Sequence, residues 1–78
     1  MNQQLIFNND FEFDAKRHAV RFSCLVIGLK VNCFIALPAR EEPARFLAAI
    51  KADAFNWEDS AERAIADDAF NPAGEIWL

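Results

Sequence analysis

Two neighbouring segments in the first half of the chain, residues 20–27 and 29–37, have an apolar residue at every second position. Both segments are rich in β-branched and aromatic residues, which favours strands. Gly28 between them predicts a two-residue type II′ turn at Gly28-Leu29, with Cys24 directly opposite Cys33. One face of the resulting hairpin is then fully apolar: Val20, Phe22, Cys24, Val26, Val31, Cys33, Ile35 and Leu37. Because a slip of one residue would mix the two faces, the pattern fixes which residues share a face.

Two shorter strands are predicted before this hairpin. Leu5-Ile6-Phe7 is an apolar run, and Phe11-Glu12-Phe13 alternates. Asn8-Asn9-Asp10 between them is a cluster of turn-forming residues. The sheet is therefore expected to meander from the N-terminus with antiparallel neighbours.

The hydrophobic period changes to 3.6 residues after Pro38, which indicates helices. The first helix should begin at about Arg40 to Glu42, because Pro43 is tolerated only in a first turn. Asn56 is the predicted N-cap of a second helix, which should end by about Asp67. The apolar positions expected to face the sheet are Phe46, Leu47, Ile50, Ala54, Trp57, Ala61, Ala64 and Ile65.

The chain ends in a turn cluster, residues 71–74, and a short apolar segment, residues 75–78, which is expected to pair on a sheet edge. With 78 residues, 54% of them hydrophobic, the sequence predicts one folded domain over residues 1–78. The expected class is α+β: an antiparallel β-meander/hairpin sheet with two α-helices packed on one face and a short C-terminal strand.

The order of these segments resembles a known bacterial family over nearly the whole chain. The segments that carry the resemblance are Phe13-Asp14, Val20-Arg21-Phe22, Val26-Ile27-Gly28-Leu29-Lys30-Val31-Asn32-Cys33, Phe46-Leu47-Ala48-Ala49-Ile50, Trp57-Glu58-Asp59-Ser60-Ala61-Glu62 and Gly74-Glu75-Ile76-Trp77-Leu78. The family is Domain of Unknown Function 1488, a group of small uncharacterised proteins. The resemblance implies a fold and a bacterial origin, and it brings no catalytic residue.

Residues suited to catalysis or metal binding are few. The chain has one histidine, two cysteines, two serines and no tyrosine. A thiol–imidazole pair would need Cys24 or Cys33 beside His18, but both thiols are predicted to face the core. We expect buried, reduced cysteines, with a Cys24–Cys33 disulfide as the alternative. Glu58 and Glu62 lie four apart on a helical face that we expect to be solvated. No catalytic residue, metal site or cofactor is predicted, and the protein is not expected to be an enzyme.

The charge and hydropathy of the chain indicate which classes of partner it is not expected to bind. The net charge is −4, divided as +2 over residues 1–40 and −6 over residues 41–78. An acidic helical half argues against nucleic acid or an anionic membrane as a partner. Met1 to Gln4 lack the basic residues of a secretory leader, and no apolar run is long enough to span a membrane. A cytoplasmic location is therefore expected.

The second face of the hairpin carries the candidate site. Leu25, Ile27 and Phe34 are apolar there, Lys30 lies beside them, and no helix remains to cover them. Either the N-terminal strands curl over this face, or it meets a second copy or another protein. The favoured function is a non-enzymatic interaction or structural module, self-associating or bound to a protein partner. The alternative is an accessory or small-ligand-binding subunit of a larger enzyme complex.

Overall fold

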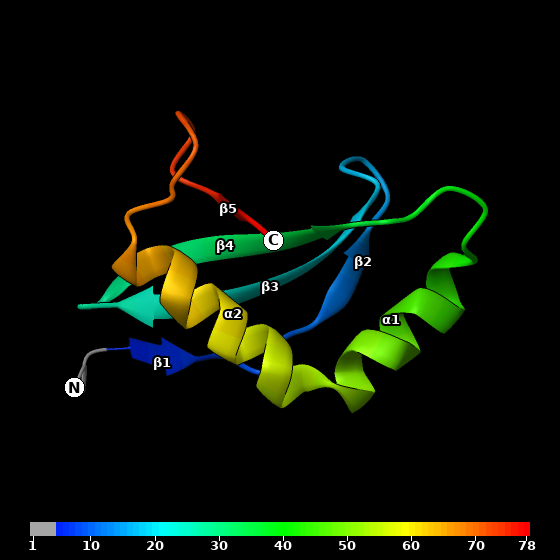
Figure 1. The fold of residues 1–78 in the computed structure, drawn as a ribbon, viewed down its shortest axis with the longest axis horizontal. Coiled ribbons are helices and arrows are strands. Elements are labelled where there is room, and N and C mark those ends of the chain that lie inside the picture. Colours follow the sequence, from blue (N-terminus) through cyan, green and yellow to red (C-terminus); the bar gives the residue numbers. More distant parts are fainter. Residues whose placement is uncertain (1–4) are drawn as a thin grey trace.

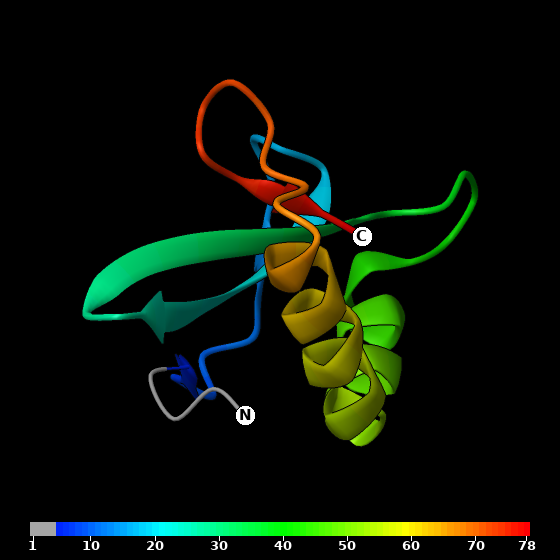
Figure 2. The ribbon, with the colours of Figure 1, turned by 60° about the vertical axis from the view of Figure 1, so that its left-hand side comes forward.

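The computed structural model describes residues 5–78 and confirms an α+β fold: a five-stranded sheet with both helices on one side (Figures 1 and 2). The strand order is β1-β3-β4-β5, and β2 also pairs with β3. The elements are β1 (Leu5–Phe7), β2 (Glu12–Asp14), β3 (Ala19–Val26), β4 (Leu29–Ala36), α1 (Pro43–Ala52), α2 (Ala54–Ala66) and β5 (Ile76–Trp77). Within this range no helix has the length and hydropathy to cross a membrane. The segment judged for a leader, residues 1–4, lies outside the described range.

The central hairpin keeps the predicted faces but turns one residue earlier than predicted. Val26 pairs with Leu29, so Ile27 and Gly28 are the central turn residues, with φ of +51° and +79°. Two positive φ values define a type I′ turn, and the predicted type II′ turn is wrong. Cys24 consequently lies opposite Val31 rather than Cys33. Moving the turn by one residue shifts the pairing by two positions, which leaves every side chain on its predicted face.

β1 and β2 follow one another along the same edge of β3 instead of pairing with each other as in a meander. Leu5–Phe7 pairs with the second half of β3, and Glu12–Asp14 pairs with its first half. Both pairings are antiparallel. The N-terminal strands therefore extend the sheet, and they do not curl over its second face.

The loop between β1 and β2 forms hydrogen bonds to Ser23, which is 1% exposed. The Asp10 carboxylate accepts hydrogen bonds from the Ser23 backbone N–H at 2.8 Å and from its hydroxyl at 2.5 Å. The Asn8 side chain donates to the same hydroxyl at 2.9 Å. Phe11 then enters the core, where its ring stacks on Phe22 at 4.6 Å between centroids. The predicted turn cluster is thus a loop that satisfies the one buried polar side chain among residues 5–78.

The core lies between the apolar sheet face and the helices. Its buried members include most of the predicted sheet residues, together with Ile50 and Ala61 from the helices. Phe46, Leu47, Trp57 and Ile65 pack against them and stay partly exposed. The buried cluster also contains Phe11 and Ile76, which were not predicted for the core.

The helices begin close to the predicted positions. Pro43 opens α1, and the Glu42 carboxylate caps it by accepting from the Arg45 N–H at 3.0 Å. Asp53 both ends α1 and precedes α2, so α2 begins earlier than predicted. Asn56 lies inside α2 and donates its side-chain N–H to Asp53 at 2.7 Å, so its prediction as the N-cap is wrong.

β5 pairs with β4 on the outer edge of the sheet, as expected for the C-terminal segment, but the pairing is parallel. Cys33 lies opposite Ile76, and Phe34 lies opposite Trp77. Ile76 is fully buried on the helix side, whereas Trp77 faces the other side with 40% of its surface exposed.

Replacing Phe22 by alanine should destabilise the domain by about 3–5 kcal/mol, because the ring is 1% exposed and is stacked on Phe11. A domain of this size has little stability to lose, so most molecules should be unfolded at 37 °C. Urea denaturation followed by circular dichroism measures the change. Phe55→Ala, compared at a dilution at which the protein is monomeric, is the matched control, since Phe55 is 82% exposed and its removal should change stability by less than about 0.5 kcal/mol. Equal effects of the two substitutions would contradict the described core.

Replacing Ile27 by asparagine should stabilise the folded monomer by about 1 kcal/mol. Ile27 is a β-branched residue in the left-handed region, where Asn is better tolerated and Asn-Gly is a preferred type I′ pair. For a domain of this length the melting temperature should rise by about 4–8 °C. The two melting temperatures should be measured at a dilution at which both proteins are monomeric, because association also raises the melting temperature. A lower melting temperature there would show that the turn is not type I′.

Candidate interaction surface

Phe34 is buried on the second face of the sheet, contrary to the expectation that it lies in an uncovered patch. It is 2% exposed. Trp77 stacks on it at 4.8 Å between ring centroids with an interplanar angle of 15°. The guanidinium carbon of Arg17 lies 4.5 Å from the Phe34 ring centroid and 5.4 Å from the Trp77 ring. The chain itself therefore covers Phe34, which removes it from the predicted interaction patch.

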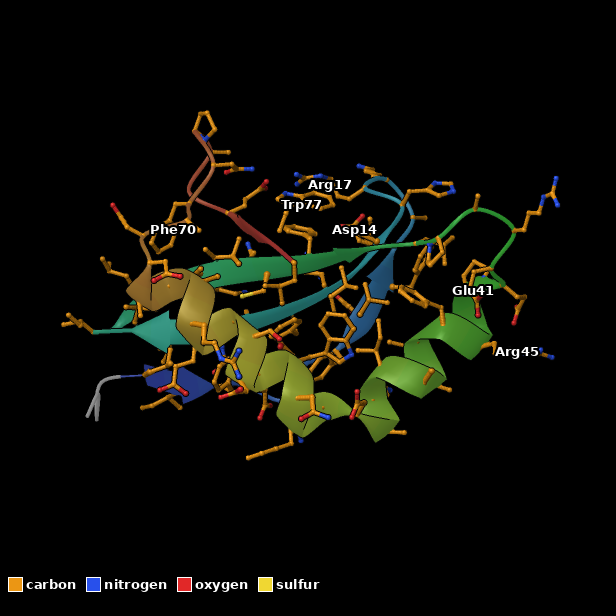
Figure 3. The ribbon with its side chains drawn as sticks, viewed as in Figure 1. Asp14, Arg17, Glu41, Arg45, Phe70 and Trp77 are labelled. Atoms are coloured by element: carbon orange, nitrogen blue, oxygen red, sulfur yellow. The ribbon has the colours of Figure 1, made fainter. Side chains whose placement is uncertain are left out.

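Arg17 is held over these rings by Glu75. Its two terminal nitrogens donate to the two oxygens of the Glu75 carboxylate at 2.7 and 2.8 Å. The turn that carries Arg17 is itself fixed by Asp14, whose Oδ1 accepts the backbone N–H groups of Lys16 and Arg17. Figure 3 shows Arg17 beside Trp77, above Asp14 at the end of β2. This network ties the β2–β3 turn to the C-terminal strand.

Glu75 accepts two further hydrogen bonds, from the Asn71 side chain at 3.0 Å and the Trp77 indole N–H at 3.2 Å. The Arg17 hydrogen bonds, followed by those of Asn71 and Trp77, lower the pKa of Glu75 to about 2. Both carboxylate oxygens of Glu75 and both terminal nitrogens of Arg17 have partners within this network. We therefore assign the network a structural role rather than a binding role.

The remaining patch residues gather at the end of the β3–β4 hairpin. Ile27 is 71% exposed in the turn, Leu25 is half-buried, and Lys30 is exposed as the cross-strand partner of Leu25. Two residues that were not predicted join them. Ile6 is 55% exposed opposite Leu25 on the same face. Leu29 is 73% exposed at the start of β4, where it pairs with Val26 and so belongs to the helix-side face. We call this surface the hairpin end: Ile6, Leu25, Ile27, Leu29 and Lys30.

A groove lies next to the hairpin end, between β1 and the first half of α2. Its volume is about 310 Å³. Its residues are Leu5 and Phe7 from β1 with Phe55, Glu58, Asp59 and Glu62 from α2. Asp59 is paired with Arg63 at 2.7 Å. The helical face expected to be solvated is exposed at Asp59 and Glu62, and it forms an acidic border beside an apolar floor.

The cysteines are free and completely buried, as predicted. They lie diagonally across the hairpin, so their thiols are neighbours on the core face. The hydrogen bond with Cys24, and then burial, raise the pKa of the Cys33 thiol, which makes it a poor nucleophile. His18 is exposed in the β2–β3 turn, with its ring edge-on to Phe13 at 6.4 Å. Among residues 5–78, no group of three or more His, Cys, Asp or Glu side chains could hold a metal ion.

A family model described as "Protein of unknown function (DUF1488)" matches residues 5–78. The chain belongs to the DUF1488 family. The protein YrdB of Escherichia coli, described as uncharacterized, is 30% identical over 84 aligned positions that cover 100% of this chain and 99% of that one. YrdB of Shigella flexneri is 29% identical over the same shares.

A solved structure has the same fold. It is the crystal structure of a DUF1488 protein of unknown function from Shewanella loihica, with a TM-score of 0.87 and 24% identity, covering 100% of this chain and 94% of that one. The family match over residues 5–78 confirms the family that the sequence resembles, and the structural likeness confirms the fold. It brings a fold, and neither the family nor these relatives bring an activity.

Glu75 should titrate far below its ordinary value near 4.5, with a pKa of about 2. Because the folded pKa is the lower one, its ion pair stabilises the fold above pH 4.5, and this contribution is lost as the pH falls from about 4.5 to about 2. Arg17→Met should raise the Glu75 pKa toward the ordinary value, measured by carbon NMR of the carboxyl group. Arg63→Met removes the exposed Asp59 pair and should leave the Glu75 titration unchanged. An unshifted Glu75 in Arg17→Met would contradict the described ion pair.

Proposed function

We propose that this protein is a non-enzymatic interaction module that self-associates through the hairpin end. The observation that carries the proposal is Ile27, which is both strained and exposed. Its φ is +51°, and 71% of its surface is open to solvent. Contacts within the folded chain therefore offer little to offset the strain.

Two features of the neighbourhood support a protein partner. Leu29 on the other side of the turn is 73% exposed, and Ile6 is 55% exposed on the adjacent strand. Single exposed apolar residues are ordinary, but here β1, the β3–β4 turn and the start of β4 each contribute one at the same end of the sheet. Lys30 beside them gives the surface a charged border, as interfaces have.

The accessory or small-ligand-binding subunit is the second candidate, and the groove between β1 and α2 favours it. A volume of about 310 Å³ is at the lower limit of small-molecule sites, which span roughly 300–1,000 Å³. The groove borders the hairpin end, where apolar side chains protrude. We therefore favour the interaction module.

The wild-type chain should sediment as a dimer at micromolar to high-micromolar concentration, and Ile27→Asn should shift the equilibrium to monomer while leaving the fold intact. The physical reason is the loss of an apolar side chain from the contact surface. Analytical ultracentrifugation over a concentration series measures the change. Ala39→Asn, an exposed position in the β4–α1 loop, is the matched control and should behave as wild type. A wild-type protein that stays monomeric at several hundred micromolar would refute self-association.

A further inference from the structure

The described ion pairs leave three charged residues around the hairpin end and the groove without a partner. The salt bridges within residues 5–78 join Arg17 to Glu75, Arg21 to Glu12 and Arg63 to Asp59. Lys30 at the hairpin end takes part in none of them. Glu58 and Glu62 at the groove also take part in none. The two neighbouring surfaces therefore carry opposite unpaired charges.

The apolar parts of the two surfaces also match. The groove offers Leu5 and Phe7 as a floor and Phe55, which is 82% exposed, as a wall. The turn offers Ile27 and Leu29, each more than 70% exposed. A groove of about 310 Å³ has room for a few aliphatic side chains.

Both surfaces lie at the same end of the sheet. β1 forms the floor of the groove and pairs with the part of β3 next to the turn, Leu5 with Val26 and Ile6 with Leu25. In Figure 1 the β3–β4 turn projects at the left end of the sheet, and β1 lies below it. The protruding hairpin end and the groove lie side by side. Two copies related by a two-fold axis can therefore each insert their turn into the groove of the other.

We propose that the occupant of the groove is the hairpin turn of a second copy of this chain, exchanged reciprocally in a symmetric dimer. Ile27 and Leu29 of each protomer lie against Leu5, Phe7 and Phe55 of the other. Lys30 of each protomer faces Glu58 and Glu62 of the other. This inference rests on the proposed self-association and specifies its geometry.

The division of charge along the chain agrees with this arrangement. Residues 1–40, which include the hairpin, carry a net charge of +2, and residues 41–78, which include α2, carry −6. Placing the hairpin of one copy on α2 of another brings unlike charges together, whereas hairpin against hairpin would oppose the two Lys30 side chains.

Two charge-reversal variants test the pairing. Lys30→Glu places an acid against the acidic groove, and the double variant Glu58→Lys with Glu62→Lys places lysines against Lys30. Each variant alone should dimerise at least about tenfold more weakly than wild type, because like charges then meet at both contacts of the symmetric dimer. An equimolar mixture should recover dimerisation, since both contacts of the mixed dimer join unlike charges. Ultracentrifugation with one variant fluorescently labelled measures the mixed species, and circular dichroism melting confirms that each variant folds.

Lys51→Glu is the matched control, because it makes the same charge change on α1 and should dimerise as wild type. A wild-type dimer whose affinity neither charge reversal changes would show that the groove is not the contact site, although the chain still self-associates. Weakened variants that fail to associate when mixed would overturn the Lys30–groove pairing, and assemblies that grow beyond a dimer would overturn reciprocal exchange. A monomeric wild type would refute both proposals and leave the groove to a segment of another protein.

Discussion

The alternation of side chains in the β3–β4 hairpin is the constraint on which the rest of the structure depends. Eight-residue strands on both sides of a two-residue turn put Val20, Phe22 and Cys24 on the same face as Val31 and Cys33. A shift of one residue would turn this apolar set to the other side and leave the helices with no surface to cover. β1, β2 and β5 then add to the two edges of the hairpin, and the two amphipathic helices close the core over its apolar face.

The sequence predicts the faces of the hairpin but not its register, and the reason is physical. Gly28 satisfies the first position of a type II′ turn and equally the second position of a type I′ turn. The two alternatives differ by one residue in each strand, so every side chain stays on the same face and the hydrophobic pattern cannot distinguish them. The choice made by the structure puts Ile27 in the left-handed region, which local preferences alone disfavour. Because residue preferences disfavour isoleucine at a positive φ, they select Gly28-Leu29 as the turn residues instead of Ile27-Gly28.

The surfaces follow less directly from the sequence than the core does, because they depend on segments far apart in the chain. The sequence pattern predicts that Phe34 is exposed. In the structure it is covered, because the parallel pairing of β5 brings Trp77 opposite it and Glu75 holds Arg17 over its ring. The groove likewise needs the pairing of β1 with β3, which sets Leu5 and Phe7 beside α2. Helical periodicity could place Glu58 and Glu62 on one face of α2. It could not place β1 beside that face, so the sequence does not predict the groove.

A strained and apolar turn is costly for a domain of this size, and the cost bears on how the protein exists in solution. A residue in the left-handed region costs the folded monomer roughly 1–2 kcal/mol, a sizeable share of the ~5–15 kcal/mol that stabilises a typical domain. Association that buries Ile27 and Leu29 stabilises the folded state by mass action and offsets that loss at sufficient concentration. An Asn-Gly turn would stabilise the monomer but would remove the apolar side chain that a second copy contacts in the proposed dimer. If the proposed dimer forms, stability of the isolated chain and affinity between copies make opposite demands on position 27, and isoleucine there is the choice that favours affinity.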